Sequence, residues 1–177
     1  MHALVVGGTG MLAGVTRWLA EQGYIVSIVS RQAQLSGNVS DGRSLNPIAV
    51  DYRDEDSLRQ CIAEAITAYG PVDLAVFWIH TDAPDAFRVI TDEVSTHTNV
   101  PWRLVHVLGS GAHVHPESPQ IPLNCLYRQI ILGFIIEGNR SRWLTHKEIS
   151  GGVIEAIRND KEYSEVGTLE PWEKRPR

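Results

Sequence analysis

The chain has 177 residues, which is the length of one domain with a sizeable core. Hydrophobic residues make up 43% and charged residues 21%, a composition that excludes a disordered, collagen-like or coiled-coil chain. The net charge of −5 argues against nucleic acid or an anionic membrane surface as the main partner, and no apolar run approaches the ~18 residues of a membrane span. The two cysteines, Cys61 and Cys125, exclude a disulfide framework and predict a reducing, cytoplasmic setting.

Short apolar runs alternate with helical patterns along the chain. The expected strands are 4–6, 24–29, 47–50, 72–79, 103–108 and 129–136. The expected helices are a stripe that begins at Leu12, then 54–69, 84–94 and 145–159, the last with a capping box of Thr145 and Glu148. We expect long loops at 32–46 and 111–124 and a polar, extended tail at 161–177. This alternation predicts a single α/β domain over residues 1–177, with a parallel sheet covered by helices on both faces.

A glycine-rich turn links the first strand to the first helix. Gly7 permits a tight turn, Gly10 lets the backbone approach a pyrophosphate closely, and Ala13 is small enough for close helix packing. The helix N-terminus then offers N–H groups to phosphate oxygens. The alternative is a turn that only connects a strand to a helix. The residues that we expect to hold a dinucleotide here are Gly7, Gly8, Thr9, Gly10, Met11 and Leu12.

The ends of the next two strands favour a particular dinucleotide. Sites for NAD usually carry an acidic residue at the end of the second strand, where this chain has Ser30 followed by Arg31. A guanidinium suits a 2′-phosphate, so the sequence favours NADP(H) over NAD(H), unless Arg31 is only a surface residue of the loop. After the third strand we expect Asp51 and Tyr52 to border the adenine, because Asp54 or Asp56 is better placed to cap the next helix.

These features together resemble the short-chain dehydrogenase/reductase superfamily, in its atypical branches. The resemblance lies in the run of residues 5–14, the Ser30-Arg31 pair and Asp51 followed by a helix, and it covers about the first 110 residues. It implies a Rossmann fold with strand order 3-2-1-4-5-6 and a nicotinamide dinucleotide at the carboxyl ends of the strands. It also implies association into a homo-oligomer such as a dimer, and a small-molecule substrate whose identity the sequence does not give.

The catalytic part of the family pattern is missing. The family uses a Tyr-x-x-x-Lys pair, but no tyrosine of this chain has a lysine four positions later. The shortened connection between the fifth and sixth strands is where such a helix would stand. A Phe-Trp-Ile-His segment, 77–80, replaces the family's usual turn after the fourth strand, and we expect Trp78 to border the cofactor.

Three residues remain as candidates for acid–base chemistry. His80 stands at the carboxyl end of the fourth strand, and its alternative is a polar cap on a buried strand. Ser110 ends the fifth strand between two glycines, where it is equally well explained as a turn residue. Tyr127 is able to reach the cleft from the next strand, although a half-buried packing role explains it too. His113 and His115 have no convincing third ligand, so we expect no metal site.

The sequence thus leaves two functions open. One is an NADP(H)-dependent oxidoreductase with a non-standard active site drawn from His80, Ser110 and Tyr127. The other is a non-catalytic dinucleotide-binding or redox-sensing module. A flavin reductase or an epimerase would use the same turn, but the missing tyrosine–lysine pair disfavours the epimerase.

Overall fold

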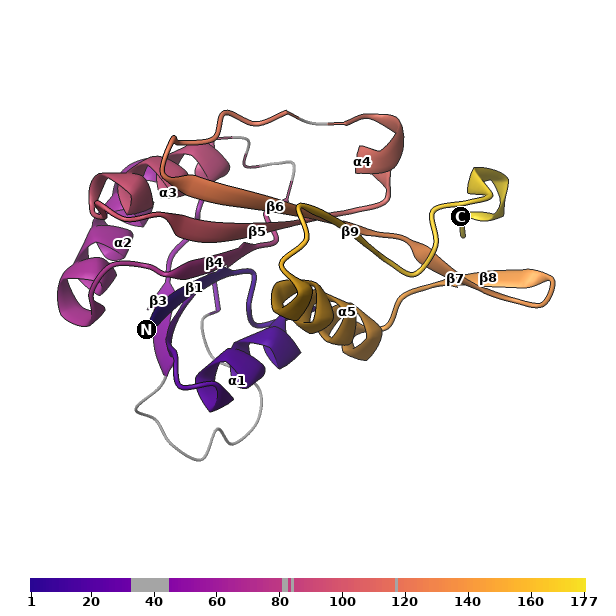
Figure 1. The fold of residues 1–177 in the computed structure, drawn as a ribbon, viewed down its shortest axis with the longest axis horizontal. Helices are drawn as coiled ribbons and strands as arrows, with labels where there is room; N and C mark the ends of the chain where they lie inside the picture. Colours follow the sequence, from indigo (N-terminus) through magenta and orange to yellow (C-terminus); the bar gives the residue numbers. More distant parts are fainter. Residues whose placement is uncertain (33–44, 81–82, 84, 117) are drawn as a thin grey trace.

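Seven parallel strands form the centre of the protein in a computed structural model that describes residues 1–32, 45–80, 83, 85–116 and 118–177 (Figure 1). The strands of this sheet, in spatial order, are β3 (Leu45–Ala49), β2 (Ile25–Ser30), β1 (His2–Val6), β4 (Leu74–Phe77), β5 (Trp102–Leu108), β6 (Cys125–Leu132) and β9 (Tyr163–Val166). The first six confirm the expected Rossmann order 3-2-1-4-5-6. A seventh strand lies beyond them at the edge.

Helices cover both faces of this sheet. The helices are α1 (Ala13–Glu21), α2 (Glu55–Tyr69), α3 (Ala86–Thr96), α4 (Gly111–Val114) and α5 (His146–Asn159), with a short 3₁₀ turn at Trp172–Lys174. Helices α2 and α3 pack on one face and α1 and α5 on the other, so the core has two layers (Figure 1). The central strands β1 and β4 are buried on both sides, which explains why they read as unbroken apolar runs. No helix of the described residues is long and apolar enough to cross a membrane.

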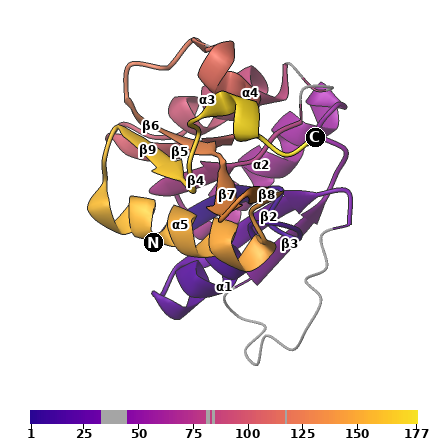
Figure 2. The same cartoon turned by 90° about the vertical axis from the view of Figure 1, so that its right-hand side faces the viewer.

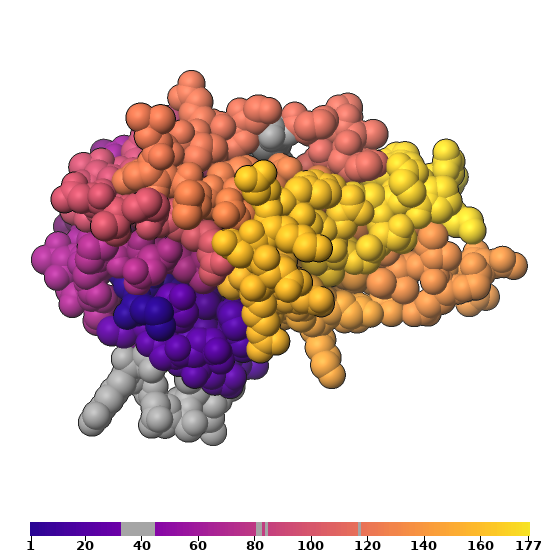
Figure 3. All heavy atoms as spheres, in the orientation of Figure 1, coloured from indigo at the N-terminus to yellow at the C-terminus, as the bar shows by residue number. Residues whose placement is uncertain are grey.

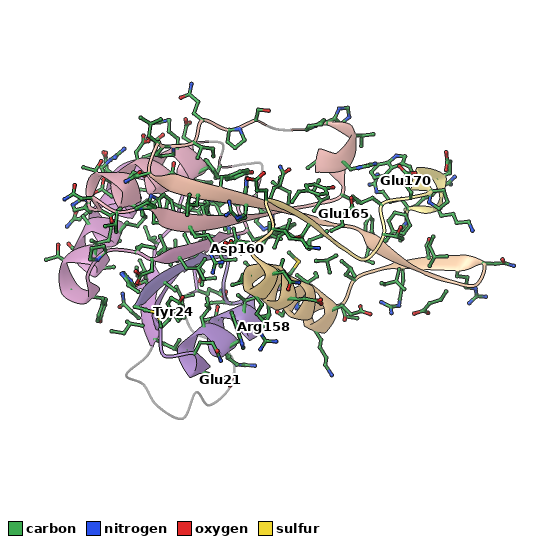
Figure 4. The ribbon with its side chains drawn as sticks, in the orientation of Figure 1. Glu21, Tyr24, Arg158, Asp160, Glu165 and Glu170 are labelled. Atoms are coloured by element: carbon green, nitrogen blue, oxygen red, sulfur yellow. The ribbon has the colours of Figure 1, made fainter. Side chains whose placement is uncertain are left out.

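Two helix starts have the predicted side-chain caps. The Asp54 carboxylate accepts a hydrogen bond from the backbone N–H of Ser57, so Asp54 caps α2 as expected. At α5, the Thr145 hydroxyl and the Glu148 carboxylate form both halves of the predicted capping box. The other end of α5 is fixed by Asp160, labelled in Figure 4, whose carboxylate accepts from Arg128 and pairs with Arg103 at 3.0 Å. These two guanidinium groups lower the pKa of Asp160.

The sixth strand differs from the prediction. Its apolar run was expected over 129–136, but β6 ends at Leu132 and the chain leaves the sheet at Gly133. A side chain at Gly133 would collide with the backbone of Thr168, so only glycine allows the two segments to cross here. The residues that follow form β7 (Phe134–Glu137), which pairs with β8 (Arg140–Trp143) in a separate antiparallel hairpin. The basic run Arg140–Trp143 is the second strand of this hairpin.

The tail also contains structure that its polar sequence did not indicate. Strand β9 pairs in parallel with β6, from Gln129 beside Tyr163 to Leu132 beside Val166. The hairpin and the last residues lie together at one end of the molecule, which faces the viewer in Figure 2 and is orange and yellow in Figure 3. There the guanidinium of Arg175 lies over the rings of Trp172 and Trp143 at 4.9 and 5.5 Å. On the same tail, Glu170 bonds His113 of α4 at 3.0 Å (Figure 4).

The close contact between α1 and α5 requires a glycine at position 14. A Cβ added at Gly14 would lie 2.7 Å from the Cβ of Ser150, whereas a Cβ at Gly151 of α5 would meet nothing within 4 Å. Both glycines lie inside helices, where alanine is favoured by ~0.5–1 kcal/mol. We therefore expect Gly151→Ala to raise the free energy of unfolding by about that amount, and Gly14→Ala to lower it. Urea unfolding followed by circular dichroism measures both, and equal effects of the two substitutions would contradict this packing.

Candidate functional site

A cavity of about 570 Å³ lies at the carboxyl ends of β1, β2 and β4. In a doubly wound parallel sheet this is the crevice where ligands bind. Its described walls are Gly7, Thr9, Gly10, Met11, Ser30, Arg31, Gln32, Tyr52, Trp78, His80 and His146. We call it the dinucleotide cavity. It brings together eight of the eleven residues that the sequence predicted for cofactor binding.

Gly7 sets the direction of the turn. Its φ of +79° is a left-handed conformation, and a Cβ there would lie 2.8 Å from the carbonyl oxygen of Trp78. The Gly7 amide donates to the carbonyl of Val29 at 3.0 Å, so the turn stays attached to β2. Both conformation and space require glycine at this position.

Gly10 plays a different part, because a Cβ there would meet no atom within 4 Å. Its φ is not in the left-handed region, so no structural reason requires glycine at this position. Gly10 itself lines the cavity. The open space beside its Cα is where a ligand phosphate would approach the backbone.

Gly8 and Leu12 are absent from the described walls of the cavity. A Cβ at Gly8 would contact Thr16 Oγ1 at 2.8 Å, and the Thr16 hydroxyl donates to the Gly8 carbonyl. Leu12 has an exposed fraction of zero and belongs to the core beneath α1. Close packing therefore explains both residues.

The end of β2 presents an unsatisfied polar group. The Ser30 hydroxyl oxygen is buried and has no hydrogen-bond partner among the described residues, although Ser30 lines the cavity. A buried hydroxyl without a partner costs stability, and at a ligand site it indicates a group that a ligand satisfies. Arg31 follows it, exposed on the cavity rim. This donor set fits a ribose that carries a phosphate.

Asp51 has a partner that the sequence did not suggest. The Arg53 side chain donates to both of its carboxylate oxygens, with the shortest distance 2.6 Å between Nη2 and Oδ2. These bonds, with a smaller contribution from Arg31, lower the pKa of Asp51 to about 2. Asp51 does not line the cavity, whereas the neighbouring Tyr52 does and is almost buried.

Helix α5 supplies a wall of the cavity that the sequence analysis missed. The Ser150 hydroxyl donates to the carbonyl of Met11 at 2.7 Å, which fastens α5 to the glycine turn. His146, at the first position of α5, then reaches the cavity. Gln32 also lines it and was not predicted. Nothing in the sequence brings His146 and Met11 together, because they are far apart along the chain.

The three acid–base candidates lie on different elements. His80 lines the dinucleotide cavity, next to Trp78, with their ring centroids 6.0 Å apart. Ser110 is buried at the start of α4 and is not among the described walls of this cavity. Tyr127 lies inside β6, where its hydroxyl bonds Nδ1 of His106 at 2.9 Å. Of the three candidates, His80 is therefore the one among the described walls of the dinucleotide cavity.

Solved structures with a similar fold are known. A short-chain dehydrogenase/reductase from Serratia marcescens BCRC 10948 aligns with 94% of this chain and 95% of its own, at 17% identity and a TM-score of 0.67. A short-chain dehydrogenase from Burkholderia cenocepacia J2315 in complex with NADP aligns over 93% and 95%, at 15% identity and a TM-score of 0.69. The citronellol catabolism dehydrogenase of Pseudomonas aeruginosa PAO1 aligns over 94% and 93%, at 16% identity and a TM-score of 0.69.

The chain has the fold of the short-chain dehydrogenases/reductases. This confirms the resemblance drawn from the sequence at the level of the fold. No protein-family model matches the chain, and no curated protein matches it either.

His106 gives the site region a measurable pH dependence. Burial lowers its pKa from the ordinary 6.5 to about 4, so the folded protein holds it neutral where the unfolded chain protonates it. The buried neutral ring therefore leaves the free energy of unfolding unaffected above pH 6.5 and lowers it as the pH falls from 6.5 toward 4. In the His106→Gln protein, the free energy of unfolding should fall by up to roughly 3 kcal/mol less between pH 6.5 and pH 4 than it does in the wild-type protein. Urea unfolding of both proteins between pH 4 and 7 measures the difference, and parallel stability curves would contradict it.

Proposed function

We propose that the chain is an NADP(H)-binding oxidoreductase of the short-chain type with a non-standard active site. The observation that carries the proposal is the buried Ser30 hydroxyl without a described partner, beside the exposed Arg31, at the rim of the dinucleotide cavity. The open space above Gly10 lies in the same cavity and suits a pyrophosphate. The neighbour from Burkholderia cenocepacia was solved with NADP.

The pairing of the Asp51 carboxylate just after β3 favours NADP(H) over NAD(H). An unpaired carboxylate near Arg31 would repel a 2′-phosphate and compete for the guanidinium. Arg53 instead engages the Asp51 carboxylate at 2.6 Å, so this negative charge is largely offset. Arg31 makes no ion pair with any described residue of the chain and remains available to a phosphate.

The chain's own residues have defined tasks in this proposal. The glycine turn and the N-terminus of α1 would hold the pyrophosphate, while Trp78 and His146 would border the other half of the dinucleotide. A bound nicotinamide supplies hydride chemistry. Of the three acid–base candidates that the sequence offered, His80 alone is among the described walls of the cavity, so it is the residue we propose to hold or donate a proton there.

A module that binds the dinucleotide without turnover is the second candidate function. Because Ser110 and Tyr127 lie outside the dinucleotide cavity, binding without turnover remains the alternative: a redox-sensing module that reports the dinucleotide. Turnover tests separate the two. An oxidoreductase should oxidise NADPH in the presence of one member of a panel of aldehydes, ketones and quinones, and His80→Ala should lower that rate. NADPH binding without turnover on the whole panel would favour the sensing module.

The dinucleotide preference is tested by calorimetric titration with NADPH and NADH. We expect wild-type protein to bind NADPH more tightly, and Arg31→Ala to weaken NADPH binding by about 10–100-fold, the value of one charge-assisted contact. NADH binding should change by less than threefold. Arg140→Ala, on the exposed hairpin strand β8, is the matched control and should leave both affinities unchanged. Equal affinity of wild-type protein for the two dinucleotides would contradict the role of Arg31.

Gly10 provides an independent test, because a side chain there has room in the protein. Gly10→Val should leave the thermal unfolding midpoint within about 2 °C of wild type and yet reduce affinity for both dinucleotides at least tenfold. Full affinity in the folded variant would place the pyrophosphate elsewhere.

A further inference from the structure

His146 stands at the edge of the dinucleotide cavity, at the first position of α5. Four residues along the helix, the Ser150 hydroxyl donates to the carbonyl of Met11 at 2.7 Å. Residues four apart lie on the same face of a helix, so His146 shares the face of Ser150 that meets the glycine turn. It lies about 6 Å further toward the start of α5, where it lines the cavity together with Thr9 and Gly10.

The imidazole of His146 is available to a ligand. The residue is exposed, and its side chain makes no hydrogen bond or ion pair with any residue in the described part of the chain. A second cavity, of about 580 Å³, adjoins the dinucleotide cavity at His80 on the side of the sheet that α3 covers. The described walls of this second cavity do not include His146, so the side chain serves the dinucleotide cavity.

The glycine turn presents free backbone amides to the same cavity. The amides of Gly10, Met11 and Leu12 donate to no acceptor among the described residues. A phosphate that binds such amides brings charged oxygens to the turn. An imidazole donates to oxygens of this kind, and hydrogen bonds to an ionised group are roughly twice as strong as neutral ones. The cavity thus offers one anionic group donors from the turn and from a side chain of α5.

The first turn of α5 is held in place from the hairpin. The guanidinium of Arg142 on β8 donates to both carboxylate oxygens of Glu148, at 2.9 and 3.0 Å. It also pairs with Glu137 of β7 at 2.8 Å, which fixes it within the hairpin. The Glu148 carboxylate in turn accepts from the backbone N–H of Thr145 at 2.8 Å. The bonds from Arg142 and Thr145 lower the pKa of Glu148 to about 2, so this network stays charged at neutral pH.

We propose that His146 donates a hydrogen bond to the pyrophosphate of the dinucleotide, where the nicotinamide half begins, and that Arg142 positions it through Glu148. The pyrophosphate is the group assigned because His146 shares its part of the cavity with the glycine turn and the free amides. Arg142 is not among the described walls of the cavity and acts only through the helix. The hairpin β7–β8, which projects beyond α5 in Figure 1, thereby contributes to the cofactor site.

The test compares three probes that share the 2′-phosphate. NADPH and 2′-phospho-ADP-ribose both contain the pyrophosphate, adenosine 2′-monophosphate lacks it, and only NADPH carries the nicotinamide. Dissociation constants are measured by calorimetry, with competition against NADPH for the weakest probe. We expect His146→Ala to weaken both pyrophosphate probes about tenfold, the effect of one exposed hydrogen bond to a charged group, and to leave adenosine 2′-monophosphate within about twofold.

An exposed histidine elsewhere provides the matched control. His115 follows α4 and lies outside the described walls of both cavities. His115→Ala should leave all three affinities unchanged, and the thermal unfolding midpoint of each variant should stay close to that of the wild type.

The positioning role of Arg142 is tested by a double-mutant cycle. Arg142→Gln removes the pair with Glu148 and should weaken NADPH binding about threefold to fivefold, whereas Arg142→Lys, which keeps the charge, should weaken it less. In the His146→Ala background, Arg142→Gln should change the affinity by less than about 1.5-fold, because no imidazole is left to position. Arg140→Gln, on the same strand and without an ion pair to any described residue, should change nothing.

The possible failures are distinct. His146 does not bind the pyrophosphate if His146→Ala leaves both pyrophosphate probes within twofold, if it weakens NADPH alone, or if it weakens adenosine 2′-monophosphate equally. Arg142 does not position His146 if the effects of the two substitutions add. The inference rests on the proposed function, so wild-type protein that binds none of the probes defeats both. NADPH binding that depends on Arg31 and not on His146 defeats this inference alone.

Discussion

At Gly7 the chain leaves β1 in a left-handed conformation, directly against the carbonyl of Trp78 at the end of β4. This contact fixes how close the first turn lies to the neighbouring strand, and therefore where α1 begins. The turn is bonded to β2 through Val29 and to α5 through Ser150. The places of α1, β2 and α5 relative to one another therefore depend on this turn. The dinucleotide cavity is the space that this arrangement leaves at the carboxyl edge of the sheet. A change in the turn would alter all of its walls together.

Two packing devices shape the two cavities differently. On one face of the sheet, Gly14 lets α5 approach α1 closely, and His146 at the start of α5 thereby reaches the dinucleotide cavity. On the other face, the connection between α4 and β6 forms no further helix in its described part, and a second cavity lined in part by His106 lies there. His80 lies between the two spaces. Two adjoining cavities, which share His80, are thus consequences of how each face is covered.

Local patterns predicted most of the fold, because the physical causes there are local. The apolar runs of β1, β2, β4 and β5 reflect burial on both faces, and the caps at Asp54 and Thr145 depend on side chains three residues away. The end of β6 was not predictable in this way. It is set by the backbone of Thr168, which crosses at Gly133, and a glycine within an apolar run gives no sign of a partner so distant along the chain. Strand β9 was missed because its outward side chains are polar.

In the candidate site, too, residues in a local motif were predictable and residues placed by long-range packing were not. The glycine turn, Ser30 and Arg31 line the cavity where the local motif predicted them, whereas the place of His146 in its wall depends on the packing of two helices. The place of His106 beside a cavity was not predicted. The sequence showed its alternation within β5, but the hydroxyl that bonds it comes from the neighbouring strand and the cavity beside it from the missing helix. Tyr127, one of the three acid–base candidates, bonds this histidine from β6.

The central claim is that the turn after β1 and the end of β2 hold one dinucleotide together. The most direct measurement is the mapping of backbone amide NMR signals during a titration with NADPH. The account predicts that the amides of Thr9, Gly10, Met11 and Arg31 shift along one saturating curve with one dissociation constant. Saturable shifts confined to other parts of the chain, or no shifts at millimolar NADPH, would contradict it.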